Sequence, residues 1–121
     1  TMVKIPIKSK EDDTILALID QHIVKGKTQD ATLLFQAANY YYSTNRDYKQ
    51  AIIWLLEAEK INPQNFYYPN LRQKLASENK DYTIAIEAAK RAISIADKEK
   101  MKKTIDSLNN KISDWEILLK K

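Results

Sequence analysis

The spacing of apolar residues predicts helices along almost the whole chain. Apolar side chains lie three or four residues apart within segments 11–25, 31–44 and 81–96, a period that places them on one face of a helix. Asp30 stands directly before the second segment, where a carboxylate can accept hydrogen bonds from the first free backbone N–H groups. Gly26, just beyond the first segment, is a typical helix-ending residue. We therefore expect amphipathic helices with defined ends.

A further helix is predicted between two break signals. Residues 44–46 interrupt the apolar period, and Asp47 follows as a helix-start residue. Asn62-Pro63 ends the helix, because the residue before a proline avoids the helical conformation. The apolar positions of this helix are Ala51, Ile52, Leu55, Ala58 and Ile61. The two alanines lie on one face, where a second helix can approach closely.

The last apolar run predicts a longer helix over 98–120 with a heptad seam. The seam residues, spaced alternately four and three apart, are Met101, Ile105, Leu108, Ile112, Trp115 and Leu119. The favoured interpretation is a capping helix whose seam packs on helix 81–96, because repeat arrays need polar-faced ends. The alternative is a homodimeric coiled coil formed through the seam from Ile105 to Leu119. Since the seam extends further than helix 81–96 can cover, the final turn of the last helix, with Trp115 and Leu119, can be left exposed.

Segment 43–61 is repeated 34 residues later, at 77–95. The identical pairs are Ser43/Ser77, Asn45/Asn79, Asp47/Asp81, Tyr48/Tyr82, Ala51/Ala85, Ile52/Ile86, Ala58/Ala92 and Ile61/Ile95. A period of about 34 residues built from two helices indicates an array of helical repeats. Moving back by the same interval places Asp13 and Ala17 at the positions of Asp47 and Ala51. Segment 11–25 is therefore interpreted as the second helix of an earlier repeat.

These features resemble the tetratricopeptide repeat (TPR) family. The residues of 32–65 that carry the resemblance are Phe35, Ala38, Asn39, Tyr42, Ala51, Leu55, Ala58 and Pro63. Among them Asn39 departs from the family pattern, which has a small residue there. The resemblance implies an all-α superhelix with about two repeats over 31–97, an N-terminal helix and loop over 11–30, and a capping helix over 98–121.

The second repeat, 66–97, departs further from the family pattern. The alanines that fit it are Ala76, Ala85, Ala89 and Ala92. Pro69, Arg72 and Gln73 do not fit the first helix of a repeat, and Asp97 replaces the closing proline. Proline is compatible with a helix only in its first turn, so Pro69 predicts a helix that begins close to it.

The composition agrees with a helical domain and argues against two classes of function, nucleic-acid binding and membrane insertion. The chain has 121 residues with one glycine and three prolines, and 44% of its residues are hydrophobic, which allows a real core. Its net charge of +4 comes from basic residues interleaved with acidic ones, whereas nucleic-acid binding needs a clustered basic face. No apolar run reaches the length of a membrane span, so no membrane insertion is expected.

The sequence shows no pattern of a catalytic, metal or cofactor site. Cysteine is absent, which excludes disulfides and thiolate ligands. His22 is the only histidine and lies between apolar neighbours, where a structural or surface role is far commoner than metal binding. Gly26 is the only glycine, so a glycine-rich phosphate loop is excluded. We expect neither enzyme activity nor a cofactor in this segment.

The TPR resemblance implies a concave groove lined by the first helices of successive repeats. The predicted partner-binding residues are Leu33, Gln36, Tyr40, Thr44, Tyr67, Asn70 and Lys74. Tyrosine suits such a surface because its ring gives large contact area and its hydroxyl a polar tip. Tyr41 and Tyr42 are expected to face the core, and Tyr68 is a further groove candidate. The alternative is that the flanking helices fill the groove and pack against these rings.

The order of features also resembles the C-terminal TPR segment of an uncharacterised exported bacterial family with an N-terminal β-rich domain of unknown function. The resemblance rests on the strand-like VKIPIK at 3–8, the helix run from AANYYY to INPQNF, and DWE in the last helix. It implies that residues 1–10 are a linker or residual strand from a missing domain. It also implies a periplasmic or cell-envelope location, with the cytoplasm as the alternative.

The leading hypothesis is a non-catalytic protein–protein interaction module that binds a peptide or partner segment in the tyrosine-lined groove. The alternatives are a structural accessory that packs on a β-rich domain of the same protein, and a homodimer formed through the C-terminal helix. The sequence does not identify the partner.

Overall fold

The computed structural model describes residues 10–121, and every regular element in that part of the chain is a helix. The elements are α1 (Lys10–Ile19), the π-helix η1 (Asp20–Lys25), α2 (Ala31–Ser43), α3 (Tyr48–Ile61), α4 (Tyr67–Glu78), α5 (Tyr82–Ile95) and α6 (Lys102–Leu119). The predicted all-α class is confirmed. The strand-like segment at 3–7 lies outside the described residues.

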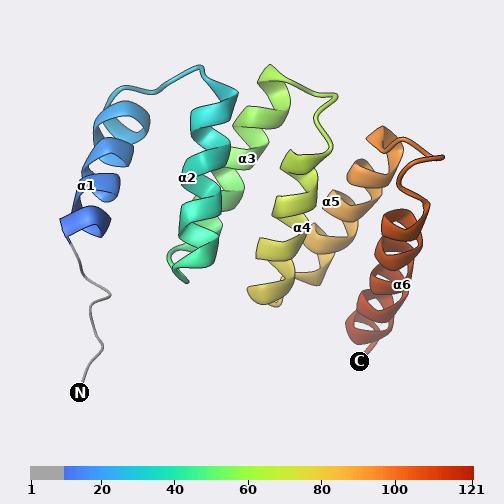
Figure 1. Ribbon diagram of the computed structural model, residues 1–121. Coiled ribbons are helices and arrows are strands. Elements are labelled where there is room, and N and C mark those ends of the chain that lie inside the picture. Colours follow the sequence, from blue (N-terminus) through green and yellow to red (C-terminus); the bar gives the residue numbers. More distant parts are fainter. Residues whose placement is uncertain (1–9) are drawn as a thin grey trace.

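Successive helices pack side by side in a row that runs from α1 to α6 (Figure 1). From α3 onward each helix packs along the one before it, and α2 also touches α4. Figure 1 shows α2 and α4 in front, with α3 and α5 behind them. This packing of consecutive helices is that of a helical repeat protein, in which each unit contacts mainly its neighbours.

The two second helices reproduce the 34-residue period. Helix α3 and helix α5 each have 14 residues, and their ends differ in number by the same interval. Asp47 accepts a hydrogen bond from Gln50 N at 3.1 Å, and Asp81 accepts one from Ile84 N at 3.3 Å. Both aspartates thus cap their helices as the sequence predicts, and Asp30 does so for α2.

Alanines form the close contacts of the core. Ala51, Ala58, Ala85 and Ala92 are completely buried. Because an alanine side chain is one methyl group, neighbouring helices can approach closely at these points, and larger side chains such as Leu55 fill the grooves beside them. The predicted close-approach positions are confirmed.

Helix α4 buries a charged residue that the repeat pattern does not anticipate. Arg72 is 2% exposed, and its guanidinium bridges Glu59 on α3 and Glu87 on α5. Nε and Nη2 donate to the two Glu59 carboxylate oxygens at 2.6 and 2.9 Å, and Nη1 and Nη2 donate to those of Glu87 at 2.5 and 3.1 Å. Burial lowers the pKa of Arg72, but the hydrogen bonds and charges of both glutamates outweigh it and raise the pKa above its ordinary value.

The final helix packs its seam on the array. Helix α6 contacts α5, and Leu108, Ile112 and Trp115 are buried while Ile105 is half-buried. This is the packing that the capping interpretation predicts; the coiled coil with a second copy stays a prediction.

Two details of α6 differ from the sequence prediction. Helix α6 begins at Lys102 rather than at 98, because the Asp97 carboxylate accepts hydrogen bonds from Glu99 N and Lys100 N and holds a separate turn. Trp115 is buried, so only Leu119 of the expected exposed pair is exposed.

The register extended back to the first helix is wrong. Helix α1 begins at Lys10, three residues before Asp13, so Asp13 lies inside the helix and does not cap it. Ala17 is exposed, whereas Ala51 and Ala85 are fully buried. Helix α1 therefore lies beside α2 without repeating the close contact of the later second helices.

Candidate functional site

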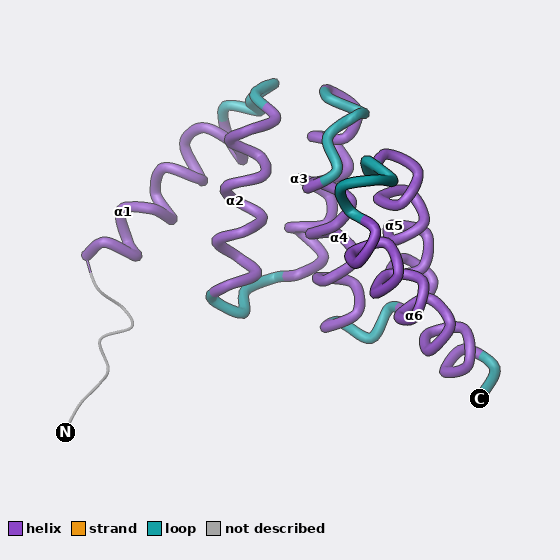
Figure 2. Tube along the Cα trace, turned by 45° about the vertical axis from the view of Figure 1, so that its right-hand side comes forward, coloured by secondary structure: helices purple, strands orange, loops and turns teal. Residues whose placement is uncertain are grey.

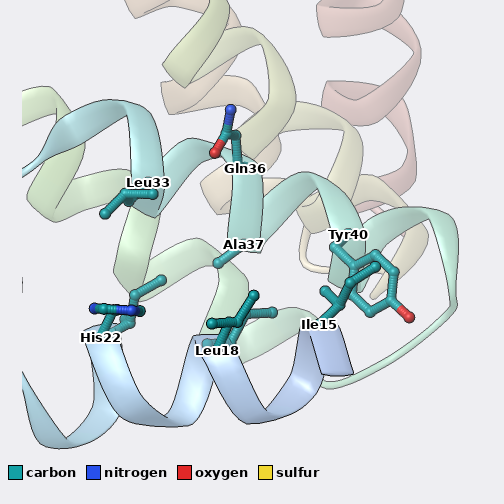
Figure 3. A pocket seen from close by; sticks show the side chains of 9 residues that line it. Ile15, Leu18, His22, Leu33, Gln36, Ala37 and Tyr40 are labelled. Atoms are coloured by element: carbon teal, nitrogen blue, oxygen red, sulfur yellow. The ribbon is translucent and has the colours of Figure 1, made fainter. Parts of the chain in front are cut away.

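An apolar hollow lies between the N-terminal helix and α2. It has a volume of about 350 Å³, at the lower end of the range for ligand pockets. Its lining residues are Ile15, Leu18, Ile19, His22, Ile23, Leu33, Gln36, Ala37 and Tyr40. Figure 3 shows His22 and Leu33 at one end of the hollow and Ile15 and Tyr40 at the other. The two helices thus contribute facing walls.

The hollow exists because α1 diverges from α2 (Figure 2). Ile19 and Ile23 on one wall and Ala37 on the other are buried, and they form the floor where the helices meet. Above that floor Leu18 is 48% exposed and Leu33 is 37% exposed. These two leucines line opposite walls of the hollow and leave apolar surface that another molecule can cover.

A polar cluster closes one end of the hollow. The Tyr40 hydroxyl donates to the carboxylate of Asp12, which is 6% exposed, and Arg46 Nη2 donates to the other Asp12 oxygen at 2.9 Å. The Arg46 guanidinium also lies over the Tyr40 ring, 5.5 Å from its centroid. We call these three residues the Asp12 clasp, because they tie the start of α1 to the end of α2 and to the following turn.

His22 lies at the opposite end and is exposed. No group of three or more potential metal ligands occurs within residues 10–121. The exposure of His22 agrees with the surface role predicted for this residue.

The structure brings together three of the residues predicted for the groove. Leu33, Gln36 and Tyr40 all line the hollow from α2. Thr44 does not line it; its hydroxyl donates to the Tyr40 carbonyl at 2.6 Å, at the end of α2. Tyr40 faces α1 rather than an open groove, so for this ring the alternative of packing against a flanking helix is the correct one.

The predicted residues of α4 lie elsewhere. Tyr67 is 63% exposed, Lys74 is exposed, and the Asn70 side chain accepts a hydrogen bond from Gln73 Nε2 at 3.1 Å. None of the three lines the hollow. The hollow is therefore shared by α2 and the N-terminal helix, and a groove shared by α2 and α4 stays a prediction.

The remaining tyrosines mostly pack inside the array. Tyr41 meets Trp54 with ring centroids 4.8 Å apart, as expected for a core-facing ring, and Tyr42 is half-buried beside Tyr48. Tyr68, a groove candidate, is instead buried against Phe35 at 5.4 Å. The position of Tyr68 one residue after Tyr67 turns it toward the core, because adjacent helical residues point about 100° apart.

Sequence reasoning missed the residues that α1 and η1 contribute. Ile15, Leu18, Ile19 and Ile23 form the apolar stripe of segment 11–25, which the sequence predicts to be the second helix of an earlier repeat rather than a wall of a hollow. A signal was present, because four large apolar residues make a stripe that can extend beyond the contact with one neighbouring helix.

No family model, curated protein sequence or solved structure matches this chain. No helix within residues 10–121 is both long and apolar enough to cross a membrane.

Proposed function

We propose that the chain is a non-catalytic protein–protein interaction module of the TPR type, and that it binds a partner segment in the hollow between α1–η1 and α2. The observation that carries the proposal is the pair of partly exposed leucines, Leu18 and Leu33, on facing walls of an apolar hollow. Large apolar side chains in a concave site give affinity, because covering them removes apolar surface from water.

The chemistry of the lining defines the partner class. Most lining residues are apolar, while Gln36 and His22 supply polar groups at the rim. A short peptide segment with two or three large apolar side chains fits this pattern, since the volume of about 350 Å³ leaves no room for a folded domain. The TPR assignment is supported by the repeated 34-residue spacing of α3 and α5 and by the buried alanines.

The proposal is tested by selecting peptides from a random library displayed on phage against the immobilised full chain. The affinity of enriched peptides is then measured for Leu33→Gln and for Leu56→Gln. The two leucines form a matched pair: Leu33 is 37% exposed in the hollow, and Leu56 is 41% exposed on α3, away from it. Because burying a whole leucine contributes about 1.5–3 kcal/mol, covering the exposed part of Leu33 predicts a loss of roughly three- to sixfold in affinity.

The expected result is enrichment of apolar peptides whose affinity falls for Leu33→Gln and stays unchanged for Leu56→Gln. Failure to enrich any peptide, or an equal loss for both variants, would reject the hollow as a binding site.

A further inference from the structure

We propose that α1 and η1 together form a hinged flap, held closed by the Asp12 clasp, and that a partner segment binds only after the flap has opened. The statement about a partner rests on the proposed function; the statement about the flap does not. Three features of residues 10–46 support the proposal: loose packing of the flap, a hinge at one end and the clasp at the other.

The flap is separated from the array on two sides. Besides the hollow described above, a second one of about 390 Å³ lies between η1, the following loop, α2 and α3. Ile23 lines both hollows, and Val24 beside it is 53% exposed. Helix α1 meets α2 at few positions, unlike the later pairs of consecutive helices, which pack along their length. Because the buried strip of α1 is narrow, its burial contributes little free energy to keeping α1 against α2.

The hinge lies at residues 28–30, in the loop that follows η1. The chain turns at Gly26, where a Cβ atom would come within 2.8 Å of the His22 carbonyl oxygen, so only glycine fits without a shift. Lys27 follows with φ of 49°, in the left-handed region. The hydrogen bonds from Lys27 N to Ile23 O and from Thr28 N to His22 O belong to the flap itself. Rotation about the backbone of 28–30 therefore moves α1 and η1 as one body.

The clasp acts far from this hinge. Asp12 precedes Gly26 by fourteen residues, which is about 21 Å along a helix. At that distance a small rotation separates Asp12 from Tyr40 and Arg46 and widens the hollow between them. The Arg46 side chain is already 23% exposed, so its charge can be hydrated when the clasp opens. The Asp12 side chain is 7% exposed while the clasp is closed, so its charge becomes hydrated only if the opening flap carries it away from α2.

If the flap gates binding, substitution of a clasp residue and substitution of a contact residue should change the peptide affinity in opposite directions. If only the open form binds the partner, the apparent affinity equals the intrinsic affinity reduced by the open fraction. Weakening the clasp raises that fraction. Tyr40→Phe and Arg46→Met should therefore tighten binding of the selected peptides, whereas loss of a contact residue such as Leu33 weakens it.

The decisive experiment is hydrogen–deuterium exchange of the full chain, which needs no ligand. A flap that has left α2 loses the burial of Ile19 and Ile23, and a short helix without such packing opens its own backbone hydrogen bonds readily. Tyr40→Phe and Arg46→Met should therefore each raise exchange in residues 15–24 by about tenfold, because each removes a hydrogen bond to a carboxylate that keeps the flap closed. Exchange in α3 and α5 should stay at the wild-type rate. Tyr67→Phe and Arg91→Met are the matched controls: Tyr67 is exposed on α4, and Arg91 donates to the Pro63 carbonyl at the other side of the array.

Each outcome decides the proposal. Faster exchange confined to residues 15–24 in both clasp variants supports the flap. Unchanged exchange there, or an equal rise in all helices, overturns it. The peptide selection then separates the two proposals. If exchange confirms the flap but no peptide is enriched, the flap is supported and the proposed function is rejected. Enriched peptides whose affinity falls in both clasp variants keep the proposed function and remove the gating.

Discussion

Replacing Arg72 by methionine should destabilise the fold far more than removing an exposed charge. Methionine keeps most of the aliphatic length of arginine, so the variant removes the guanidinium with little loss of packing. What remains is Glu59, whose side chain is 11% exposed and which then carries a charge with no cation beside it. A buried ion pair that loses one partner typically costs about 3–5 kcal/mol. At about 4 °C per kcal/mol for a domain of this size, the melting temperature should fall by roughly 12–20 °C.

Substitution of Glu59 and substitution of Glu87 should lower the free energy of unfolding by different amounts, because the two side chains differ in burial. The Glu87 side chain is 60% exposed, so Glu87→Gln should cost less than about 1 kcal/mol, as for a surface ion pair. Glu59→Gln removes the better-buried partner and should cost about 1.5–3 kcal/mol. The double variant Arg72→Met/Glu59→Leu should recover much of the loss, because an apolar pair leaves no unpaired charge.

Urea unfolding gives these free energies, with two intrinsic probes in different parts of the array. Trp54 on α3 and Trp115 on α6 are both buried, and circular dichroism reports all helices. Lys74→Met, which removes an exposed charge from α4, is the control. A cost below about 1 kcal/mol for Arg72→Met, or equal costs for Glu59→Gln and Glu87→Gln, would refute the reasoning that burial decides the contribution of each ion pair.

Further predictions concern the core, the cap and one tyrosine. Ala58→Leu should cost about 1–3 kcal/mol in urea unfolding by overpacking a fully buried position, whereas Ala17→Leu on the exposed face of α1 should cost less than about 0.5 kcal/mol; equal costs would contradict the close-contact assignment. Ile112→Asp should cost about 3–5 kcal/mol, and Leu119→Asp almost nothing; a folded wild-type dimer in light scattering that becomes a stable monomer with Ile112→Asp would instead favour the coiled coil. Burial, and next a nearby glutamate, raise the pKa of Tyr48 above 10.0, so the folded chain holds this proton more tightly than the unfolded one and stability falls as pH rises through 10.0. The urea midpoint of Tyr48→Phe should fall less than that of the wild type between about pH 8 and pH 11, and an equal fall would remove Tyr48 as the cause.

The ends of the helices could be predicted from the sequence because they depend on neighbouring residues. Asp30, Asp47 and Asp81 bond to backbone N–H groups two or three residues away. Asn62-Pro63 likewise ends α3 through the local conformation before proline. The buried alanines also followed from the sequence, because the repeat itself fixes their spacing.

The Arg72 network could not be predicted, because its members come from three helices. In the sequence Arg72 is only a departure from the repeat pattern. Its partners Glu59 and Glu87 lie on the two flanking helices, and their closeness to Arg72 is a property of the folded array. The hollow was missed for the same reason. The tilt of α1 depends on the turn at Gly26 and on a contact between Asp12 and Arg46 across 34 residues, and neither follows from the apolar period of the helix.

The packing of each helix on the next has a consequence for how the chain folds. Contacts between sequence neighbours close short loops, so little chain entropy is lost before a contact forms. Proteins of such low contact order fold in microseconds to milliseconds. A nucleus can form at any adjacent helix pair and grow in both directions, and the α2–α5 segment, with its buried alanines and the Arg72 network, is the natural place for it. Helix α1, which meets α2 at few positions, would then be the last to join and the first to leave.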